Sequence, residues 1–251
     1  MKIIYKNDKI KEILVIGHRG ASSIAPENTL KAFKKAIELK ADYIEFDVHQ
    51  SKDGEIVIMH DSNTLRTTGH LGLIKQMTLE ELKKLDCGDG ERIPTLRELI
   101  KLAKGKIKLN CEVKARGFAK DIINLLIEED IIESTIISSF KHDILLKLKE
   151  IEPRIKLASL EPTRIGWIKS WISRKKLYRD AIDNNFYAIN PFFKLVNKSL
   201  ISKVHNNKIK IFTWTVNSES MIKKLIELGV DGIITNDIEL ARKILDKKIN
   251  S

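Results

Sequence analysis

The sequence predicts an α/β protein in which eight parallel strands close into a single (β/α)8, or TIM-type, barrel. Three observations lead to this fold class. Eight short apolar runs rich in β-branched residues alternate with segments whose apolar residues recur at helical spacing. The chain has 251 residues, which is about the length that such a barrel requires. No linker rich in Gly, Pro or Ser divides it, so we expect residues 1–251 to form one domain.

The first strand, helix and strand occupy the chain up to residue 48. A strand is expected over 12–17, where four apolar residues run together as in a strand that is buried on both faces. A helix is expected over about 27–40, because apolar residues recur there at helical spacing and Pro26 stands just before its first turn. The next strand, over 43–48, completes the order that opens a parallel sheet.

The second strand is expected to continue into a β-hairpin. An Asp-Gly pair lies between two strand-like runs, which is a strong hairpin signal. A turn over residues 51–54 would place Gln50 opposite Glu55, and counting back along both arms would place His60 opposite Glu45. We therefore expect His60 and the acidic residues of the second strand to be neighbours.

The remaining elements follow in a regular alternation after a short insertion at about 61–94. This insertion is the longest irregular connection, and connections of this kind are usually lids or binding loops. It contains one expected helix near 78–85, where Thr78 and Glu81 form a capping-box pattern. Further helices are expected at about 95–104, 118–129, 142–150, 197–205, 219–228 and 238–247. The other strands are expected at 107–114, 135–139, 155–160, 186–190, 210–216 and 232–235.

The composition narrows the classes of protein. With 43% hydrophobic and 31% charged residues, the chain resembles a globular protein with a sizeable core. No apolar run approaches the ~20 residues that cross a bilayer, and residues 1–11 are too polar for a signal peptide, so a cytoplasmic location is expected. Cys87 and Cys111 lack metal or redox spacing, which favours reduced thiols. The lysines behind the net charge of +11 are scattered over every helix, so no nucleic-acid partner is expected. The oligomeric state is left open.

Charged and polar residues gather at the carboxyl ends of the expected strands, where such a barrel carries its catalytic groups. Side chains alternate across a strand, so Glu45 and Asp47 share one face of the second strand, and Glu112 and Lys114 share one face of the third. The complete set of strand-end residues is His18, Arg19, Glu45, Asp47, His60, Glu112, Lys114, Ser138, Ser139, Trp214 and Asn217.

The three carboxylates of this set predict a metal site. Glu45, Asp47 and Glu112 would repel one another strongly at neutral pH unless a cation held them together. Ligation by oxygen atoms alone favours one divalent cation, Mg²⁺ or Ca²⁺, over zinc. The alternative is that the acids form ordinary ion pairs with Arg19 and Lys114. We favour a functional role because inward-pointing charges are costly to bury.

The other charged residues complete a set suited to cleaving a phosphate ester. Arg19 and Lys114 are natural contacts for an anion, and Arg19 can grip two phosphate oxygens at once. His18 and His60 can act as general acid and base. A metal ion, two cationic side chains and two histidines together are suited to phosphoryl-ester cleavage. The spacing leaves open which histidine is the acid and which is the base.

At this point the chain resembles a known family over nearly its full length. It is similar to the glycerophosphodiester phosphodiesterases, which are phosphatidylinositol-phospholipase-C-like barrels. Any one matching segment is weak evidence, but their order along the chain is specific. The segments are His18-Arg19-Gly20, Pro26-Glu27-Asn28-Thr29, Glu45-Phe46-Asp47-Val48, Lys52-Asp53-Gly54, His60-Asp61, Ile93-Pro94-Thr95-Leu96, Glu112-Val113-Lys114, Ser139-Phe140, Trp214-Thr215-Val216-Asn217 and Asp231-Gly232-Ile233-Ile234-Thr235-Asn236.

The resemblance implies a reaction and a role for each of eight residues. The reaction is hydrolysis of a small-molecule glycerophosphodiester to sn-glycerol 3-phosphate and an alcohol. In a route proposed for such enzymes, the neighbouring glycerol hydroxyl attacks phosphorus and water then opens the cyclic phosphodiester. The implied acid and base are His18 and His60, the ligands of Mg²⁺ or Ca²⁺ are Glu45, Asp47 and Glu112, the phosphate contacts are Arg19 and Lys114, and the residue against the glycerol is Trp214.

Several features leave alternatives open. The connection over 62–92 is short for this family, and many relatives carry Pro where this chain has residues 236–238. An open site could admit a lysophospholipid, which would make the activity lysophospholipase D-type. The basic, Trp-containing segment 164–179 could touch an anionic membrane transiently, although an outer barrel helix would have the same apolar stripe. A non-catalytic barrel that binds phosphorylated ligands or nucleic acid is supported by the net charge alone.

Overall fold

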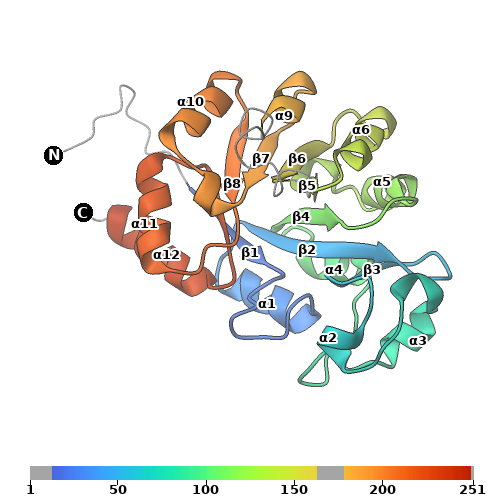
Figure 1. Cartoon of the computed structure of the whole chain (residues 1–251). Coiled ribbons are helices and arrows are strands. Elements are labelled where there is room, and N and C mark those ends of the chain that lie inside the picture. The colour runs from blue at the N-terminus through green and yellow to red at the C-terminus, as the bar shows by residue number, and fades with distance from the viewer. Residues whose placement is uncertain (1–12, 163–177, 250–251) are drawn as a thin grey trace.

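The computed structural model describes residues 13–162 and 178–249, and it confirms the barrel. Eight parallel strands among these residues are hydrogen-bonded in the order β1-β9-β8-β7-β6-β5-β4-β2, and the pairing of β1 with β2 closes the ring (Figure 1). The barrel strands are β1 (Leu14–His18), β2 (Tyr43–Gln50), β4 (Lys108–Val113), β5 (Thr135–Ser139), β6 (Lys156–Glu161), β7 (Ala188–Pro191), β8 (Lys210–Thr213) and β9 (Gly232–Thr235).

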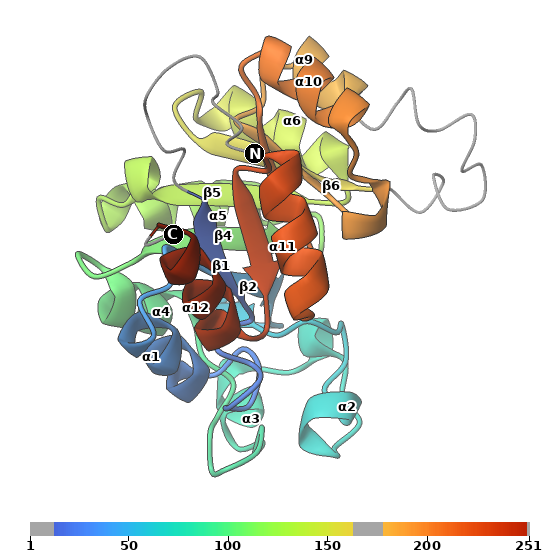
Figure 2. The same cartoon turned by 90° about the vertical axis from the view of Figure 1, so that its left-hand side faces the viewer.

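Helices surround the strands, as Figure 2 shows from a second direction. The outer helices are α1 (Leu30–Glu38), α4 (Leu96–Ala103), α5 (Ala119–Glu128), α6 (His142–Ile151), α9 (Arg179–Asp183), α10 (Lys198–Asn206), α11 (Glu219–Leu228) and α12 (Ile238–Ile249). The insertion carries α2 (Leu65–Thr68), the 3₁₀ helix η1 (Ile74–Gln76) and α3 (Leu79–Lys83). Two further 3₁₀ helices are η2 (Ile132–Ser134) and η3 (Phe193–Leu195). Within these described parts, no helix is both long and apolar enough to span a membrane.

Helix α1 begins later than expected. The sequence predicted a helix over about 27–40, whereas α1 begins at Leu30. Asn28 has a φ of +58°, which is outside the helical region, and its backbone N–H donates to Arg19 O (3.0 Å) instead of continuing a helix. Thr29 caps α1 by accepting a hydrogen bond from the backbone N–H of Ala32. Residues 26–28 therefore form a loop at the catalytic end, where their side chains are available to the site.

The hairpin is present, but the expected register was wrong by one residue. Strand β3 (Ile56–Ile58) runs antiparallel to β2, and Gln50 pairs with Ile56 rather than with Glu55. The turn is longer because Ser51 and Glu55 pair with each other: Ser51 N–H donates to Glu55 O (2.9 Å), and Glu55 N–H donates to Ser51 Oγ (3.0 Å). Gly54 closes this three-residue loop with a φ of +91°.

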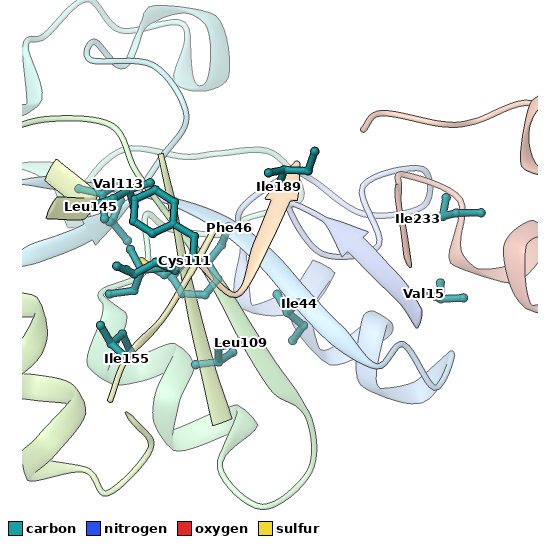
Figure 3. Close-up of a cluster of buried hydrophobic side chains, with 14 of the residues drawn as sticks. Val15, Ile44, Phe46, Leu109, Cys111, Val113, Leu145, Ile155, Ile189 and Ile233 are labelled. Atoms are coloured by element: carbon teal, nitrogen blue, oxygen red, sulfur yellow. The ribbon is translucent and has the colours of Figure 1, made fainter. Parts of the chain in front are cut away.

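The barrel has two apolar layers, and a third, smaller cluster of buried residues lies under the insertion. One lies inside the ring of strands: Ile16, Tyr43, Ile136, Ala158, Ala188, Phe212 and Ile234. The other lies between the strands and the helices, and Figure 3 shows part of it around Ile44, Phe46, Cys111 and Val113. Because side chains alternate along β2, its outward apolar residues require Glu45 and Asp47 to face the barrel interior. Packing thus determines the direction of the acids.

Further features of the chain are the two cysteines, the cap of α3 and the basic segment. Cys87 and Cys111 are both buried, and neither is in a disulfide. The capping box of Thr78 and Glu81 forms at the start of α3. Apart from Tyr178 and Arg179, the basic segment 164–179, which could be either a membrane contact or an outer barrel helix, lies outside the described residues.

Candidate active site

Three buried carboxylates form the centre of the site. In the parallel pairing of β2 with β4, Asp47 lies opposite Glu112, and Glu45 lies two residues earlier on the same face of β2. One oxygen atom from each carboxylate lies within 4.8 Å of the other two. Their exposed fractions are 4% for Glu45, 1% for Asp47 and 8% for Glu112, so water screens the repulsion between their charges only weakly. The structure brings the predicted metal-ligand set together.

The proton affinities of these acids differ because their surroundings differ. Burial and the charge of Asp47 raise the pKa of Glu112 to about 7, although Lys114 opposes the shift. Burial and the same neighbouring charge raise the pKa of Glu45 well above its usual value. Burial also opposes the charge of Asp47, but Lys114 and Arg19 overcome it and hold the pKa of Asp47 below its usual value. With all three carboxylates ionised, the cluster would carry one more negative charge than its two cations neutralise.

Arg19 and Lys114 lie beside the acids as predicted. Arg19 Nη1 donates to Glu27 Oε1 (2.9 Å), and Arg19 Nε is 3.4 Å from Asp47 Oδ2. Lys114 Nζ donates to Glu112 Oε1 (2.6 Å) and is 3.2 Å from Asp47 Oδ1. The ion pairs of the alternative interpretation therefore exist. They do not remove the case for a metal, because three carboxylates share these two cations.

The donor set fits a hard divalent cation. Asp47 Oδ1 is buried and accepts no hydrogen bond, although the Lys114 ammonium group lies near it. The other Asp47 oxygen, Oδ2, is fixed by a hydrogen bond from Asn28 Nδ2 (2.9 Å). Mg²⁺ and Ca²⁺ prefer oxygen ligands such as these converging carboxylates. The oxygen that lacks a hydrogen bond is free to bind such an ion.

Residue His18 is held by an amide. Its Nδ1 lies 2.6 Å from Asn236 Oδ1, which can accept a hydrogen bond from Nδ1–H and so favours the tautomer with its lone pair on Nε2. Burial, with a smaller contribution from the charge of Arg19, lowers the pKa of His18 to about 4. The imidazole is therefore neutral at physiological pH and can accept a proton.

The second histidine, His60, is held by a carboxylate. Its Nδ1 lies 2.7 Å from Asp61 Oδ1. Burial lowers the pKa of His60, whereas the charge of Asp47 and the hydrogen bond with Asp61 oppose this shift. The backbone N–H of Met59 donates to Asp47 O (2.9 Å), so His60 follows directly after a residue that is hydrogen-bonded to the strand carrying the acids. The two histidines thus differ in the partner of Nδ1, which is an amide oxygen for one and a carboxylate for the other.

The first turn of the chain after β1 brings several of these groups together. Arg19 has a φ of +56°, and in this conformation its backbone N–H donates to Glu45 Oε2 (2.9 Å) while its side chain reaches Glu27 and Asp47. Gly20 follows with a φ of +82°, and a Cβ atom there would lie 2.7 Å from the backbone carbon of Ala32. The turn therefore needs a glycine at position 20.

The remaining strand-end residues make contacts within the protein. Trp214 Nε1 donates to Asn190 O (2.7 Å), and the ring packs against Phe140 and Phe192 with centroids 5.4 and 5.5 Å away. Asn217 Oδ1 accepts a hydrogen bond from the backbone N–H of Asn236 (2.9 Å), which supports the partner of His18. Ser139 Oγ donates to a backbone carbonyl of β4, and Ser138 is buried, so neither serine points to a nucleophile.

Sequence reasoning assigned no role to four residues that contact the site: Glu27, Asn28, Asp61 and Asn236. A signal existed for Asn236, which follows the last strand at the catalytic end, and for Asp61, which is adjacent to His60. Glu27 and Asn28 lie in a loop without periodicity, so the spacing of residues could not have located their side chains.

Comparison with known proteins agrees with this geometry. A model of the glycerophosphoryl diester phosphodiesterase family matches residues 18–240. The chain is similar to a glycerophosphodiester phosphodiesterase from Caldanaerobacter subterraneus subsp. tengcongensis, with 38% identity over 93% of this chain and 98% of that protein. It is also similar to the structure of an Oleispira antarctica phosphodiesterase in complex with the product sn-glycerol-3-phosphate, with a TM-score of 0.79, 28% identity, and coverage of 93% of this chain and 96% of that one. A Silicibacter pomeroyi structure with a TM-score of 0.88 and 23% identity, covering 96% and 95% of the two chains, shows the same fold.

Proposed function

Because the chain belongs to the glycerophosphoryl diester phosphodiesterase family and is therefore a phosphoric diester hydrolase, we propose that it hydrolyses glycerophosphodiesters by metal-dependent acid–base catalysis. The products are sn-glycerol 3-phosphate and an alcohol. The observation that carries this proposal is the convergence of three buried carboxylates beside two cations and two histidines at one end of the barrel. Membership of a hydrolase family disfavours the non-catalytic barrel.

We assign one divalent cation, Mg²⁺ or Ca²⁺, to Glu45, Asp47 and Glu112. Bound there, the ion supplies positive charge that favours build-up of negative charge on the phosphoryl oxygens. Asn28 orients Asp47 for this role through its hydrogen bond to Oδ2. Partners of this kind commonly change metal affinity when they are removed.

Arg19 and Lys114 are assigned to the phosphate. Arg19 is held on one side by Glu27 and approaches Asp47 on the other, so its guanidinium group is oriented before substrate arrives. The Lys114 ammonium group contacts both Glu112 and Asp47, which places a positive charge next to the proposed metal ligands. Both groups complement a phosphodiester anion.

The different partners of the two histidines favour different first roles. Burial keeps His18 neutral, and the Asn236 amide oxygen orients its ring, which suits removal of a proton from the attacking hydroxyl group. The Asp61 carboxylate can stabilise a protonated His60, which suits donation of a proton to the departing alcohol oxygen. If the neighbouring glycerol hydroxyl attacks first, a cyclic phosphodiester results. Water then opens the ring with the proton transfers reversed.

The assignment of Trp214 to the glycerol rests on its surroundings. It forms an aromatic cluster with Phe140 and Phe192. The flat apolar surface of such a cluster can pack against the carbon atoms of glycerol while charged groups bind the phosphate.

A second candidate function, lysophospholipase D-type cleavage, is favoured by exposed apolar side chains near the site. Leu65, Leu71 and Leu73 in the insertion are 49%, 70% and 41% exposed, and Ile24 in the loop after β1 is 56% exposed. Side chains of this kind can contact an acyl chain. If they do, Leu65→Ser with Leu71→Ser should lower turnover of lysophosphatidylcholine but not of glycerophosphocholine. Ile127→Ser, on outer helix α5 and equally exposed at 49%, is the matched control.

The test of the proposed function is release of glycerol 3-phosphate from glycerophosphocholine and glycerophosphoethanolamine in Mg²⁺, Ca²⁺ or EDTA. We expect release that needs a metal and that His18→Ala abolishes. Release that continues in EDTA would refute the metal assignment. Release of choline from lysophosphatidylcholine alone would establish the second candidate, and no product from any of the three substrates would refute both.

A further inference from the structure

Arg66 on α2 connects the two sides of the proposed active site. Its Nε–H donates to Asp61 Oδ2 (2.6 Å), and its Nη2–H donates to Glu27 Oε1 (2.6 Å). Asp61 Oδ1 lies 2.7 Å from His60 Nδ1, and Glu27 Oε1 accepts from Arg19 Nη1 at 2.9 Å. A single guanidinium group therefore touches both carboxylates that hold the proposed acid and the proposed phosphate contact.

We propose that Arg66 is a positioning residue that fixes His60 through Asp61 and Arg19 through Glu27 at the same time. The proposal rests on the proposed function, because it concerns the groups that would carry out that reaction. It also gives the insertion a structural role, since the insertion then completes the active site from outside the barrel.

The exposure of the three side chains supports an orienting role. Glu27 and Asp61 are 25% and 26% exposed, so either carboxylate could turn towards water if it had one partner fewer. The Arg66 side chain is 49% exposed, and ion pairs this exposed contribute little to stability. Its removal should therefore change the orientation of the catalytic groups more than it changes folding.

The backbone that presents Arg66 is fixed without its side chain. Thr64 is buried, its backbone N–H donates to Gly72 O (2.9 Å), and its carbonyl accepts from Thr68 Oγ1 (2.9 Å). Gly69 ends α2 with a φ of +71° and a hydrogen bond from its N–H to Leu65 O (2.8 Å). Truncation at position 66 should leave this turn in place, so a change in activity would report the loss of the guanidinium group.

The first arm of the experiment compares Arg66→Ala with Arg97→Ala. Arg97 is a matched control on outer helix α4, because its side chain is 54% exposed and also pairs with two carboxylates, Glu128 and Glu129. We expect kcat/KM for glycerophosphocholine to fall about 10- to 100-fold in Arg66→Ala. Arg97→Ala should match the wild type, and both variants should melt at similar temperatures.

Further variants separate the two sides of the connection. Asp61→Asn should lower kcat, and Glu27→Gln should raise KM, because they act on His60 and Arg19 respectively. Arg66→Ala should change both constants, and adding it to Asp61→Asn should lower kcat little further, since the two changes remove one contact. Free guanidinium ion should restore part of the activity of Arg66→Ala, whereas Arg66→Lys, with a single ammonium group, should be intermediate.

The second arm does not depend on the substrate. In the wild type, the proton on His60 Nδ1 is held by Asp61 and should give a downfield imidazole N–H signal in the NMR spectrum, assigned with His60→Gln. This signal should weaken or broaden in Arg66→Ala and persist in Arg97→Ala. An unchanged signal together with unchanged kcat and KM would overturn the role of Arg66. A wild type without activity would overturn the proposed function, and the signal would still decide whether Arg66 orders His60.

Discussion

Binding of the divalent cation should release protons, and the number released should depend strongly on pH. The perturbation is addition of Mg²⁺ or Ca²⁺ to metal-free protein at pH 6 and at pH 8. Metal binding requires ionised carboxylates. Glu112, with a pKa of about 7, and Glu45, whose pKa is also raised, hold protons that the metal must displace. Asp47 is ionised at both pH values because its pKa is below the usual value.

The size of the effect follows from the pKa of Glu112. A group that titrates at about 7 is about nine-tenths protonated at pH 6 and about one-tenth protonated at pH 8. Glu112 alone should therefore release about 0.9 proton at pH 6 and about 0.1 at pH 8, and Glu45 adds to the release. For each proton displaced, the affinity for the metal should weaken about tenfold per pH unit below pH 7.

The assay is isothermal titration calorimetry in pairs of buffers with different heats of ionisation. Glu112→Gln should bind the metal more weakly and release about 0.9 proton fewer at pH 6. The control is Glu152→Gln, because a hydrogen bond from Arg154 lowers the pKa of Glu152 to about 2 and this pair lies outside the site. A proton count that is the same at pH 6 and pH 8, or an affinity independent of pH, would refute the reasoning about the acidic cluster.

Three further predictions concern single residues. The folded pKa of His18, about 4, is below its ordinary value of 6.5, so its contribution to the free energy of unfolding is present above pH 6.5 and is lost as pH falls towards 4. This loss is at most roughly 3 kcal/mol. Tm should therefore fall over this pH range, and His18→Gln should flatten the fall. Asn28→Gly, which accommodates the φ of +58°, should weaken metal binding roughly 10- to 100-fold in calorimetry by freeing Asp47, and unchanged affinity would contradict the proposed orienting contact. Gly20→Ala should destabilise the protein by roughly 2 kcal/mol because of its positive φ and its contact with Ala32, and a Tm within 1 °C of the wild type, instead of roughly 4–8 °C lower, would disprove this.

Much of the fold was predictable because periodicity carries the information. The strands over 135–139 and 232–235 and the helix over 219–228 have the predicted bounds. Glu45 and Asp47 were predictable for the same reason, since the apolar residues that alternate with them must pack outwards. Wherever the chain alternates in a regular way, hydrophobic burial alone determines which side chains face the interior.

The parts that could not be predicted depend on irregular backbone. The hairpin register was wrong because a hydroxyl-supported pair between Ser51 and Glu55 lengthened the turn by one residue, and an Asp-Gly signal does not specify that length. Arg66 lies 39 residues from Glu27, and the contact forms between a loop and a one-turn helix. Neither segment has a period from which a direction could be inferred. Contacts of this kind depend on tertiary structure.

The acidic cluster also limits how stable this protein can become. Glu45, Asp47 and Glu112 are negative or proton-holding groups buried next to one another, an arrangement that works against folding when no metal is present. Replacing an acid with its amide would relieve this repulsion while removing a proposed ligand. Selection for heat resistance alone would therefore tend to recover inactive proteins. The same substitutions would be useful to an experimenter, because a folded but inactive variant can retain an uncleaved substrate for study.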